Sequence, residues 1–274
     1  MNQKILIGLI VGLVLAAGAF AVIHHHNSAA ASQESAGTSV PVNQLLTQAA
    51  QYEAQGNLLG AKQDYDQIIN NYPDYDKIQD VQDKLGVLNI KLIFSPAQIP
   101  SDTISYEVVP GDSLGKLAAK YHTTVQLIKR ANGLTSDVIR AGEMLRIWTA
   151  PFTVLVNKSQ NVLFLKSGGE VLKIYRVSTG KDNTTPVGTF KIATKIENPV
   201  WFRPNGAPVP AESPQNELGT RWMGFNDPHY GLHGTIHPDE VGQQATEGCV
   251  RMDNKDVEEL FDILPVGTEV DIQN

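Results

Sequence analysis

Residues 231–251 read GLHGTIHPDEVGQQATEGCVR and contain Cys249, the only cysteine of this 274-residue chain. His233 lies sixteen positions before that cysteine. A thiol becomes a strong nucleophile only as the thiolate, and a nearby imidazole is the usual base that generates it near neutral pH. Gly248, directly before the cysteine, permits the backbone geometry in which successive N–H groups face an oxyanion. The stretch therefore predicts catalysis by Cys249 with His233 as general base, against the alternative of a cysteine buried in a core.

The order of these residues along the chain excludes one class of enzyme. All seven histidines precede Cys249, whereas in papain-like peptidases the histidine follows the cysteine. His229 and His237 are therefore the alternative bases. The spacing of four between these histidines and His233 would also suit zinc ligands on a helix, but the prolines and glycines around them disfavour a helix there. We expect neither a metal nor another cofactor.

Length and composition set the class of protein. A chain of 274 residues is typical of about two domains, and 42% hydrophobic residues are enough for buried cores. A net charge of −7 offers no basic surface for nucleic acid, so we expect no nucleic-acid partner. A single cysteine excludes an internal disulfide, so cysteine usage says nothing about the redox compartment.

The amino-terminal region contains an uncharged run of nineteen apolar residues, from 5 to 23. The run is long enough to cross a bilayer as a helix, and Lys4 before it favours a cytoplasmic amino end. We therefore predict a transmembrane anchor over 1–23, followed by a small, polar linker over 24–41. The alternative is a cleavable signal peptide, with the alanines at 29–31 as the cleavage site. Both interpretations place the remaining chain outside the cytoplasm.

Residues 42–94 show a helical pattern. Apolar and aromatic positions recur three and four residues apart, Gly56 interrupts the first run, and Pro73 closes the unit. This spacing resembles one tetratricopeptide repeat followed by an amphipathic helix. The resemblance implies a segment that binds a protein partner, and a plain helical spacer is the alternative.

Residues 104–148 begin with ISYEVVPGDSL, in which a short strand ends at Pro-Gly and a polar residue can cap the helix that follows. A second helix starts at the threonines 123 and 124, and a final strand closes the unit. This strand–helix–helix–strand pattern closely resembles the LysM module. The resemblance implies binding of N-acetylglucosamine-containing glycan, and so of peptidoglycan. It places the glycan-binding candidates in two turns, at Gly111, Asp112, Ser113, Asn132, Gly133 and Leu134.

Residues 152–273 contain short apolar runs separated by polar and glycine turns, which is typical of a β-meander. We predict one helix, over 256–264, which Asp253 or Asn254 can cap. The predicted strands cover 152–157, 162–166, 171–178, 188–195 and 268–272. Residues 198–230 are rich in Pro, Gly and Asn and too long for a simple connection, so we interpret them as a functional loop or lid.

The carboxy-terminal region carries several motifs in a characteristic order. They are His233-Gly234-Thr235, then Thr246-Glu247-Gly248-Cys249-Val250-Arg251, with TPVGTF at 185–190, LGTRW at 218–222 and NKDV at 254–257. Together they closely resemble the catalytic domain of YkuD-type L,D-transpeptidases. The resemblance implies a multidomain chain with a mainly-β catalytic domain at 152–273. A small α+β LysM module, a short helical segment and an amino-terminal transmembrane helix accompany it.

The resemblance also implies a reaction and a set of roles. Cys249 attacks the carbonyl between diaminopimelate and the terminal D-Ala of a tetrapeptide stem, D-Ala leaves, and an amine of a second stem resolves the thioester into a cross-link. His233 takes the thiol proton, and its other ring nitrogen is held by a backbone carbonyl near Gly234. The amide groups of Glu247, Gly248 and Cys249 face the oxyanion. The substrate-binding candidates are Arg251, which suits a carboxylate, and Thr235, Arg221 and Tyr230.

One position departs from the family pattern. Glu247 stands where the family usually has a histidine, and a carboxylate pointing at the nucleophile would oppose thiolate formation. We expect Glu247 to turn toward solvent or to pair with Arg251 or Arg221. Two alternative functions stay open, an L,D-carboxypeptidase, in which water replaces the acceptor amine, and a non-catalytic peptidoglycan-binding protein. We expect the bacterial cell envelope as location, with the chain anchored in the cytoplasmic membrane and the catalytic domain in the periplasm or cell wall.

Overall fold

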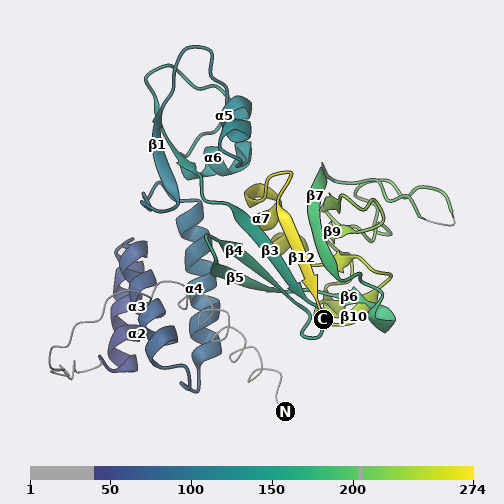
Figure 1. The fold of residues 1–274 in the computed structure, drawn as a ribbon, viewed down its shortest axis with the longest axis horizontal. Coiled ribbons are helices and arrows are strands. Elements are labelled where there is room, and N and C mark those ends of the chain that lie inside the picture. Colours follow the sequence, from purple (N-terminus) through teal and green to yellow (C-terminus); the bar gives the residue numbers. More distant parts are fainter. Residues whose placement is uncertain (1–39, 204–205) are drawn as a thin grey trace, which may run out of the picture. The chain divides into compact units, whose positions relative to one another are not determined.

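Figure 1 shows the fold of the computed structural model, which describes residues 40–203 and 206–274. The chain divides into two compact units, one ending at Asn89 and the other beginning at Ile90. The predicted transmembrane anchor at 1–23 and nearly all of the predicted linker at 24–41 lie outside the described residues. Within the two described ranges, no helix combines the length and the apolar character needed to cross a membrane.

The first unit consists of helices that each bury one apolar face. They are α2 (Val42–Ala54), α3 (Leu58–Asn71) and most of α4 (Ile78–Ile93). Gly56, with a φ of +74°, follows the first helix, and the side chain of Asn57 caps α3 by accepting from the Gly60 N–H. The core contains Leu45, Ala49, Ala61, Tyr65, Ile68, Val81, Leu85 and Leu88. The predicted helices are confirmed, whereas their identity as a tetratricopeptide repeat stays a prediction.

Residues 103–148 form the predicted strand–helix–helix–strand unit. Its elements are β1 (Thr103–Glu107), α5 (Leu114–Lys120), α6 (Val125–Ala131) and β2 (Met144–Trp148). The two strands pair antiparallel. Ser113 and Thr124 cap the two helices, because each hydroxyl accepts from the backbone N–H three residues further on. The small core contains Val108, Leu114, Leu117, Ala118, Ile128, Leu145 and Ile147.

This unit packs against the carboxy-terminal domain, although the sequence predicts a separate module. Leu127 and Trp148 belong to the same apolar cluster as the strands of the carboxy-terminal sheet. Arg146 is buried, and its guanidinium donates to the carbonyl oxygens of Ile93 at 2.8 Å and of Leu92 at 3.3 Å. The last turn of α4, the LysM-like unit and the catalytic domain therefore share one compact unit.

Helix α7 (Asn254–Ile263) makes further contacts with the LysM-like unit. The carboxylate of Asp262 forms an ion pair with Arg130 at 2.8 Å, and the Asp262 carbonyl oxygen accepts from the Thr124 hydroxyl. Arg130 lies in α6 and Thr124 is its N-cap. Helix α6 of the LysM-like unit is therefore bound to α7 of the catalytic domain by an ion pair and a hydrogen bond.

The carboxy-terminal domain is built on an eight-stranded sheet with the order β11-β9-β8-β7-β12-β3-β4-β5. Its strands are β3 (Phe152–Asn157), β4 (Val162–Ser167), β5 (Glu170–Arg176), β7 (Gly188–Glu197), β8 (Arg221–Phe225), β9 (Gly231–His233), β11 (Val250–Arg251) and β12 (Glu269–Gln273). In β3, Phe152, Val154 and Val156 are buried and alternate with less buried residues, as a strand with one core face requires. A separate parallel pair joins β6 (Thr179–Gly180) to β10 (Gln244–Thr246).

The segment at 198–230 differs from its prediction as a loop. It contains β8, which lies between β7 and β9 inside the sheet. The two- and three-residue strands β6, β9, β10 and β11 are also missing from the prediction. Strands this short show too little alternation to be recognised, because only pairing with neighbours stabilises them. Helix α7 begins at Asn254, two residues before its predicted start, and Asp253 occupies the N-cap position without a side-chain cap hydrogen bond.

Candidate active site

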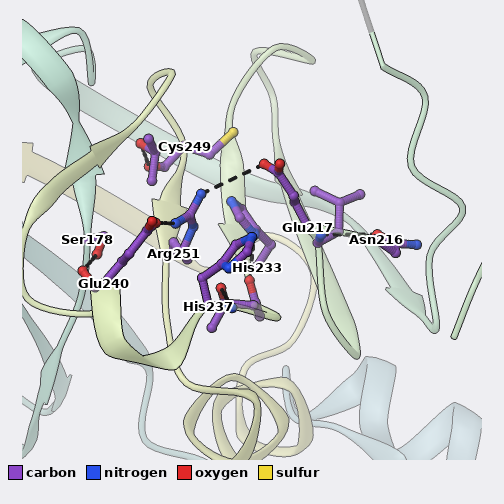
Figure 2. A network of polar contacts seen from close by, with 12 residues as sticks. Ser178, Asn216, Glu217, His233, His237, Glu240, Cys249 and Arg251 are labelled. Atoms are coloured by element: carbon purple, nitrogen blue, oxygen red, sulfur yellow. Dashed lines mark hydrogen bonds and ion pairs between the residues drawn. The ribbon is translucent and has the colours of Figure 1, made fainter. Parts of the chain in front are cut away.

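The parallel pairing of β9 with β11 brings the predicted catalytic residues together. In its register, Leu232 pairs with Val250 and His233 with Arg251. Side chains alternate between the two faces of a sheet, so Arg251 and, just before the strand, Cys249 lie on the same face as His233. The sheet edge therefore places the cysteine, the histidine and the arginine around one site (Figure 2).

These three residues line a cleft of about 720 Å³. Its apolar lining includes Ile196 and the segment 199–202, of which Phe202 is 75% exposed. The charged part of the lining consists of Lys181, Glu217, Glu240, Glu247 and Arg251. Part of the segment predicted as a functional loop thus forms one side of the cleft. A cleft of this size can take a ligand as large as a short peptide.

The Cys249 thiol is neutral near pH 7. Burial raises its pKa to about 11, although a hydrogen bond from the Gly231 backbone and the positive charge of Arg251 both act to lower it. The hydrogen bond that Sγ donates goes to the carbonyl oxygen of His229, at 3.7 Å. The resting structure therefore holds a protonated thiol whose hydrogen bond goes to a backbone carbonyl.

The His233 imidazole is neutral as well. Its side chain is 5% exposed, and burial lowers its pKa to about 4. The backbone carbonyls of Gly234 and Glu217 oppose this shift, and the positive charge of Arg251 adds to it. Nδ1 lies 2.7 Å from the Gly234 carbonyl oxygen. A carbonyl only accepts, so Nδ1 carries the proton and Nε2 carries the lone pair. This is the backbone contact that the family resemblance implies, and it leaves Nε2 as the basic atom.

Arg251 is held by two carboxylates. Its side chain is buried, Nη1 pairs with Glu240 and Nη2 lies 3.9 Å from Glu217 (Figure 2). The predicted pairing of Glu247 with Arg251 or Arg221 is absent among the described contacts. The Glu247 side chain is exposed, as the alternative expectation has it, and Arg221 donates to a backbone carbonyl instead. Sequence reasoning missed both glutamates, because nothing distinguishes them from other loop acids until Arg251 is seen between them.

Gly248 occupies a position that only glycine fits. Its φ is +141°, and a Cβ there would lie 2.7 Å from the ring of Tyr230. The Gly248 N–H donates to the Thr246 hydroxyl at 3.2 Å, and that hydroxyl donates to the Cys249 carbonyl oxygen at 2.7 Å. Of the three amide groups expected to face an oxyanion, the Gly248 N–H is therefore engaged by Thr246. Glu247 and Cys249 remain as candidate donors.

The other predicted residues lie around this centre in different roles. Thr235 is buried, and its hydroxyl accepts from the His237 N–H at 2.8 Å. The alternative base His229 has a side chain that is 81% exposed and lies 3.0 Å from Asp227. His229, His233 and His237 all line the cleft, but no group of three or more His, Cys, Asp or Glu residues in the described chain is arranged to hold a metal ion.

The LysM-like candidates fall into two turns, as the resemblance implies. Gly111 and Gly133 have φ values of +91° and +64°, which L side chains rarely adopt. The Asp112 carboxylate accepts from the Val109 N–H at 2.9 Å. The Asn132 side chain is used within the protein, because it bonds both the N–H and the carbonyl of Arg146 and the carbonyl of Ile128.

Comparison with known proteins agrees with this geometry. The model of the L,D-transpeptidase catalytic domain matches residues 151–272, and that of the LysM domain matches residues 106–148. The protein assigned as L,D-transpeptidase YkuD of Bacillus licheniformis is 34% identical over 177 residues, which cover 62% of this chain and 98% of that protein. Its namesake in Bacillus subtilis is 33% identical over 176 residues, with the same coverage.

Solved structures include an L,D-transpeptidase C442S mutant from Enterococcus faecium, which is 22% identical with a TM-score of 0.39. That match covers 45% of this chain and 50% of the other. The relationship rests on the sequence relatives, because the Bacillus proteins are matched over nearly their whole length at about one third identity. This chain belongs to the YkuD family of L,D-transpeptidases.

Proposed function

We propose that this L,D-transpeptidase cross-links peptidoglycan stems through a thioester on Cys249, with its LysM domain binding the glycan. The observation that carries the proposal is the arrangement of the Cys249 thiol and the His233 imidazole at the edge of the sheet. A neutral thiol and a neutral imidazole whose Nδ1 donates to the Gly234 carbonyl lie on one face of the sheet, in a cleft open to a peptide.

The chemistry proceeds in two balanced halves. His233 Nε2 accepts the thiol proton as Sγ attacks the carbonyl carbon of the donor stem. The C–N bond to D-Ala then breaks, D-Ala leaves with the proton from Nε2, and the acyl group remains on sulfur. In the second half an acceptor amine attacks the thioester, Nε2 takes the amine proton, and the sulfur leaves and regains it.

The electrostatics of the site support proton transfer during the attack rather than before it. A thiol with a pKa of about 11 does not give its proton to an imidazole with a pKa of about 4 in the resting site. Bound substrate changes this balance because the developing oxyanion takes up the charge, with the amides of Glu247 and Cys249 as donors. The proposed roles of these amides rest on their place beside the nucleophile.

Arg251 is proposed to bind the substrate carboxylate in addition to its ion pairs with Glu240 and Glu217, which line the cleft. Its Nη2 is the less engaged end, since 3.9 Å separates it from Glu217. A stem carboxylate can bind there beside the guanidinium, which suits carboxylates through its planar donors. Thr235, Arg221 and Tyr230 stay weaker substrate-binding proposals, because they are not among the residues that line the cleft and only their closeness to the motif along the chain supports them.

The proposed location is the bacterial cell envelope. The apolar run at 5–23 supports an anchor in the cytoplasmic membrane, and the LysM domain supports attachment to peptidoglycan on the outer side of that membrane. We also propose that the helices at 42–94 bind a protein partner, on the basis of their spacing alone.

A stem-processing assay tests the proposal. The full chain in detergent is incubated with purified tetrapeptide stems, and products are identified by mass spectrometry. Cross-linked dimers with released D-Ala are the expected result, and the Cys249→Ala variant should form none. Tripeptide without dimers would replace the proposal by an L,D-carboxypeptidase. Equal absence of products in the parent and in Cys249→Ala would favour a non-catalytic peptidoglycan-binding protein.

A further inference from the structure

Asn254, the first residue of α7, binds the backbone of Thr235, directly after the Gly234 carbonyl that His233 contacts. Its Oδ1 accepts from the Thr235 N–H at 3.0 Å, and its Nδ2 donates to the Thr235 carbonyl oxygen at 2.8 Å. The same Oδ1 accepts from the Thr220 N–H at 3.2 Å. One side chain therefore ties the end of β9 to the start of β8 and to the start of α7.

The Thr235 N–H and the Gly234 carbonyl belong to one peptide group. A trans peptide is planar, and its N–H and C=O point in opposite directions. His233 Nδ1 binds the carbonyl end of this group and Asn254 Oδ1 binds the N–H end. The peptide is thus held between the two side chains. An acceptor at the N–H polarises the peptide, which makes its carbonyl a better acceptor for Nδ1–H.

Two glycines make room for this arrangement. A Cβ on Gly234 would lie 2.1 Å from Asn254 Oδ1, and a Cβ on Gly219 would lie 2.2 Å from the same atom. Gly234 does not have a positive φ, so its lack of a side chain serves the close approach of Asn254 rather than a turn. The glycine after the histidine is explained by the asparagine that packs on it.

We propose that Asn254 is a positioning residue for the base, and that it holds His233 in the tautomer with the proton on Nδ1 through the Gly234–Thr235 peptide. The inference rests on the proposed role of His233 as general base. Without the hydrogen bonds from Asn254 to Thr235 (the Asn254 clamp), the Gly234–Thr235 peptide can rotate, and Nδ1 then loses its fixed acceptor. The imidazole then also populates the other tautomer, whose Nε2 carries a proton and accepts none.

The test compares four proteins as full chains labelled with ¹⁵N-histidine. They are the parent, Asn254→Ala, Asn254→Asp and the control Asn132→Ala. Asn132 is a matched control because it bonds the N–H and the carbonyl of one residue, Arg146, in the same paired way, at 2.7 and 2.8 Å. The ¹⁵N shifts report which ring nitrogen of His233 is protonated, and the His233→Gln variant identifies that signal by its loss.

The expected result is a loss of the single tautomer that is largest in Asn254→Ala. The parent and Asn132→Ala keep the proton on Nδ1. Asn254→Asp should keep it in part, because one carboxylate oxygen still accepts from the Thr235 N–H while the other faces the Thr235 carbonyl oxygen without a proton to donate. With tetrapeptide stems, kcat of Asn254→Ala should fall about 10- to 100-fold while KM changes less than about twofold. Asn254→Asp should recover part of kcat.

Two outcomes would overturn the inference. One is an unchanged tautomer in Asn254→Ala, and the other is a tautomer change in Asn132→Ala that matches it, which would make the effect one of general stability. The measurements also separate this inference from the proposed function. If Asn254→Ala changes the tautomer but the parent processes no stems, the positioning role of Asn254 stands and the proposed function is wrong. If the parent is active but Asn254→Ala keeps the tautomer, the proposed function stands and the positioning role of Asn254 is wrong.

Discussion

At the residue scale, the site holds a neutral thiol and a neutral imidazole, and this predicts how Cys249 reacts with a simple alkylating agent. Because burial raises the thiol pKa to about 11, only a small fraction is thiolate at pH 7. The rate of alkylation by iodoacetamide should rise about tenfold for each pH unit from 7 toward 10. Intact-mass spectrometry gives the rate, and Cys249→Ala is the blank. A rate that is already level near pH 7 would reveal a preformed thiolate–imidazolium pair.

The buried imidazole also makes stability depend on pH. His233 has a pKa of about 4 in the folded chain and 6.5 when unperturbed, so the unfolded chain binds its proton more tightly. Its contribution to the free energy of unfolding should be full above pH 6.5 and decline as the pH falls, by up to about 3 kcal/mol near pH 4. Urea denaturation at pH 7, 5 and 4 measures the decline. The His233→Gln variant should lose less over the same range, and parallel losses would contradict this account.

At the element scale, the turn between β10 and β11 sets the position of the nucleophile. Gly248→Ala should reduce turnover of stems by about 100-fold or more, because its Cβ would meet the Tyr230 ring at 2.7 Å in a backbone conformation with φ of +141°. Gly169→Ala is the matched control, since its φ is +88° and a Cβ there meets nothing within 4 Å. The control should lose about 1–2 kcal/mol of stability and keep its activity. Similar activity in the two variants would show that the turn does not position Cys249.

At the scale of the whole molecule, the LysM domain and the catalytic domain share one compact unit with the last turn of α4, and Arg146 joins the LysM domain to that turn. Arg146→Met removes two hydrogen bonds to the last carbonyls of α4 and should lower the free energy of unfolding by about 2–4 kcal/mol. Arg140→Met, at an exposed position, should change it by less than about 0.5 kcal/mol. Tryptophan fluorescence and residual activity should be lost together on heating. Activity that survives the unfolding of the LysM domain would show that the two domains are independent.

The same packing decides how glycan binding should be studied. Removal of residues 104–148 would uncover the catalytic core where Leu127 and Trp148 now contact it, and it would leave Asp262 without Arg130. Loss of activity in such a deletion would therefore say little about glycan. Substitutions in the turn at 111–113 and at 133–134 leave these contacts in place and are the better probe, whereas Asn132 supports the backbone of Arg146.

The sequence by itself determined the order of the domains, most of the longer helices and strands, and the candidate nucleophile with its candidate base. These follow from local signals, namely the periodicity of apolar residues, caps, turn glycines and a single cysteine in a distinctive motif. Only the tertiary structure decided which residues surround Cys249. The register of β9 against β11, the two carboxylates at Arg251 and the clamp of Asn254 on the Gly234–Thr235 peptide join segments that are separate in the chain. The two- and three-residue strands β9 and β11 are too short to be recognised from their pattern, because their stability comes from the neighbours with which they pair.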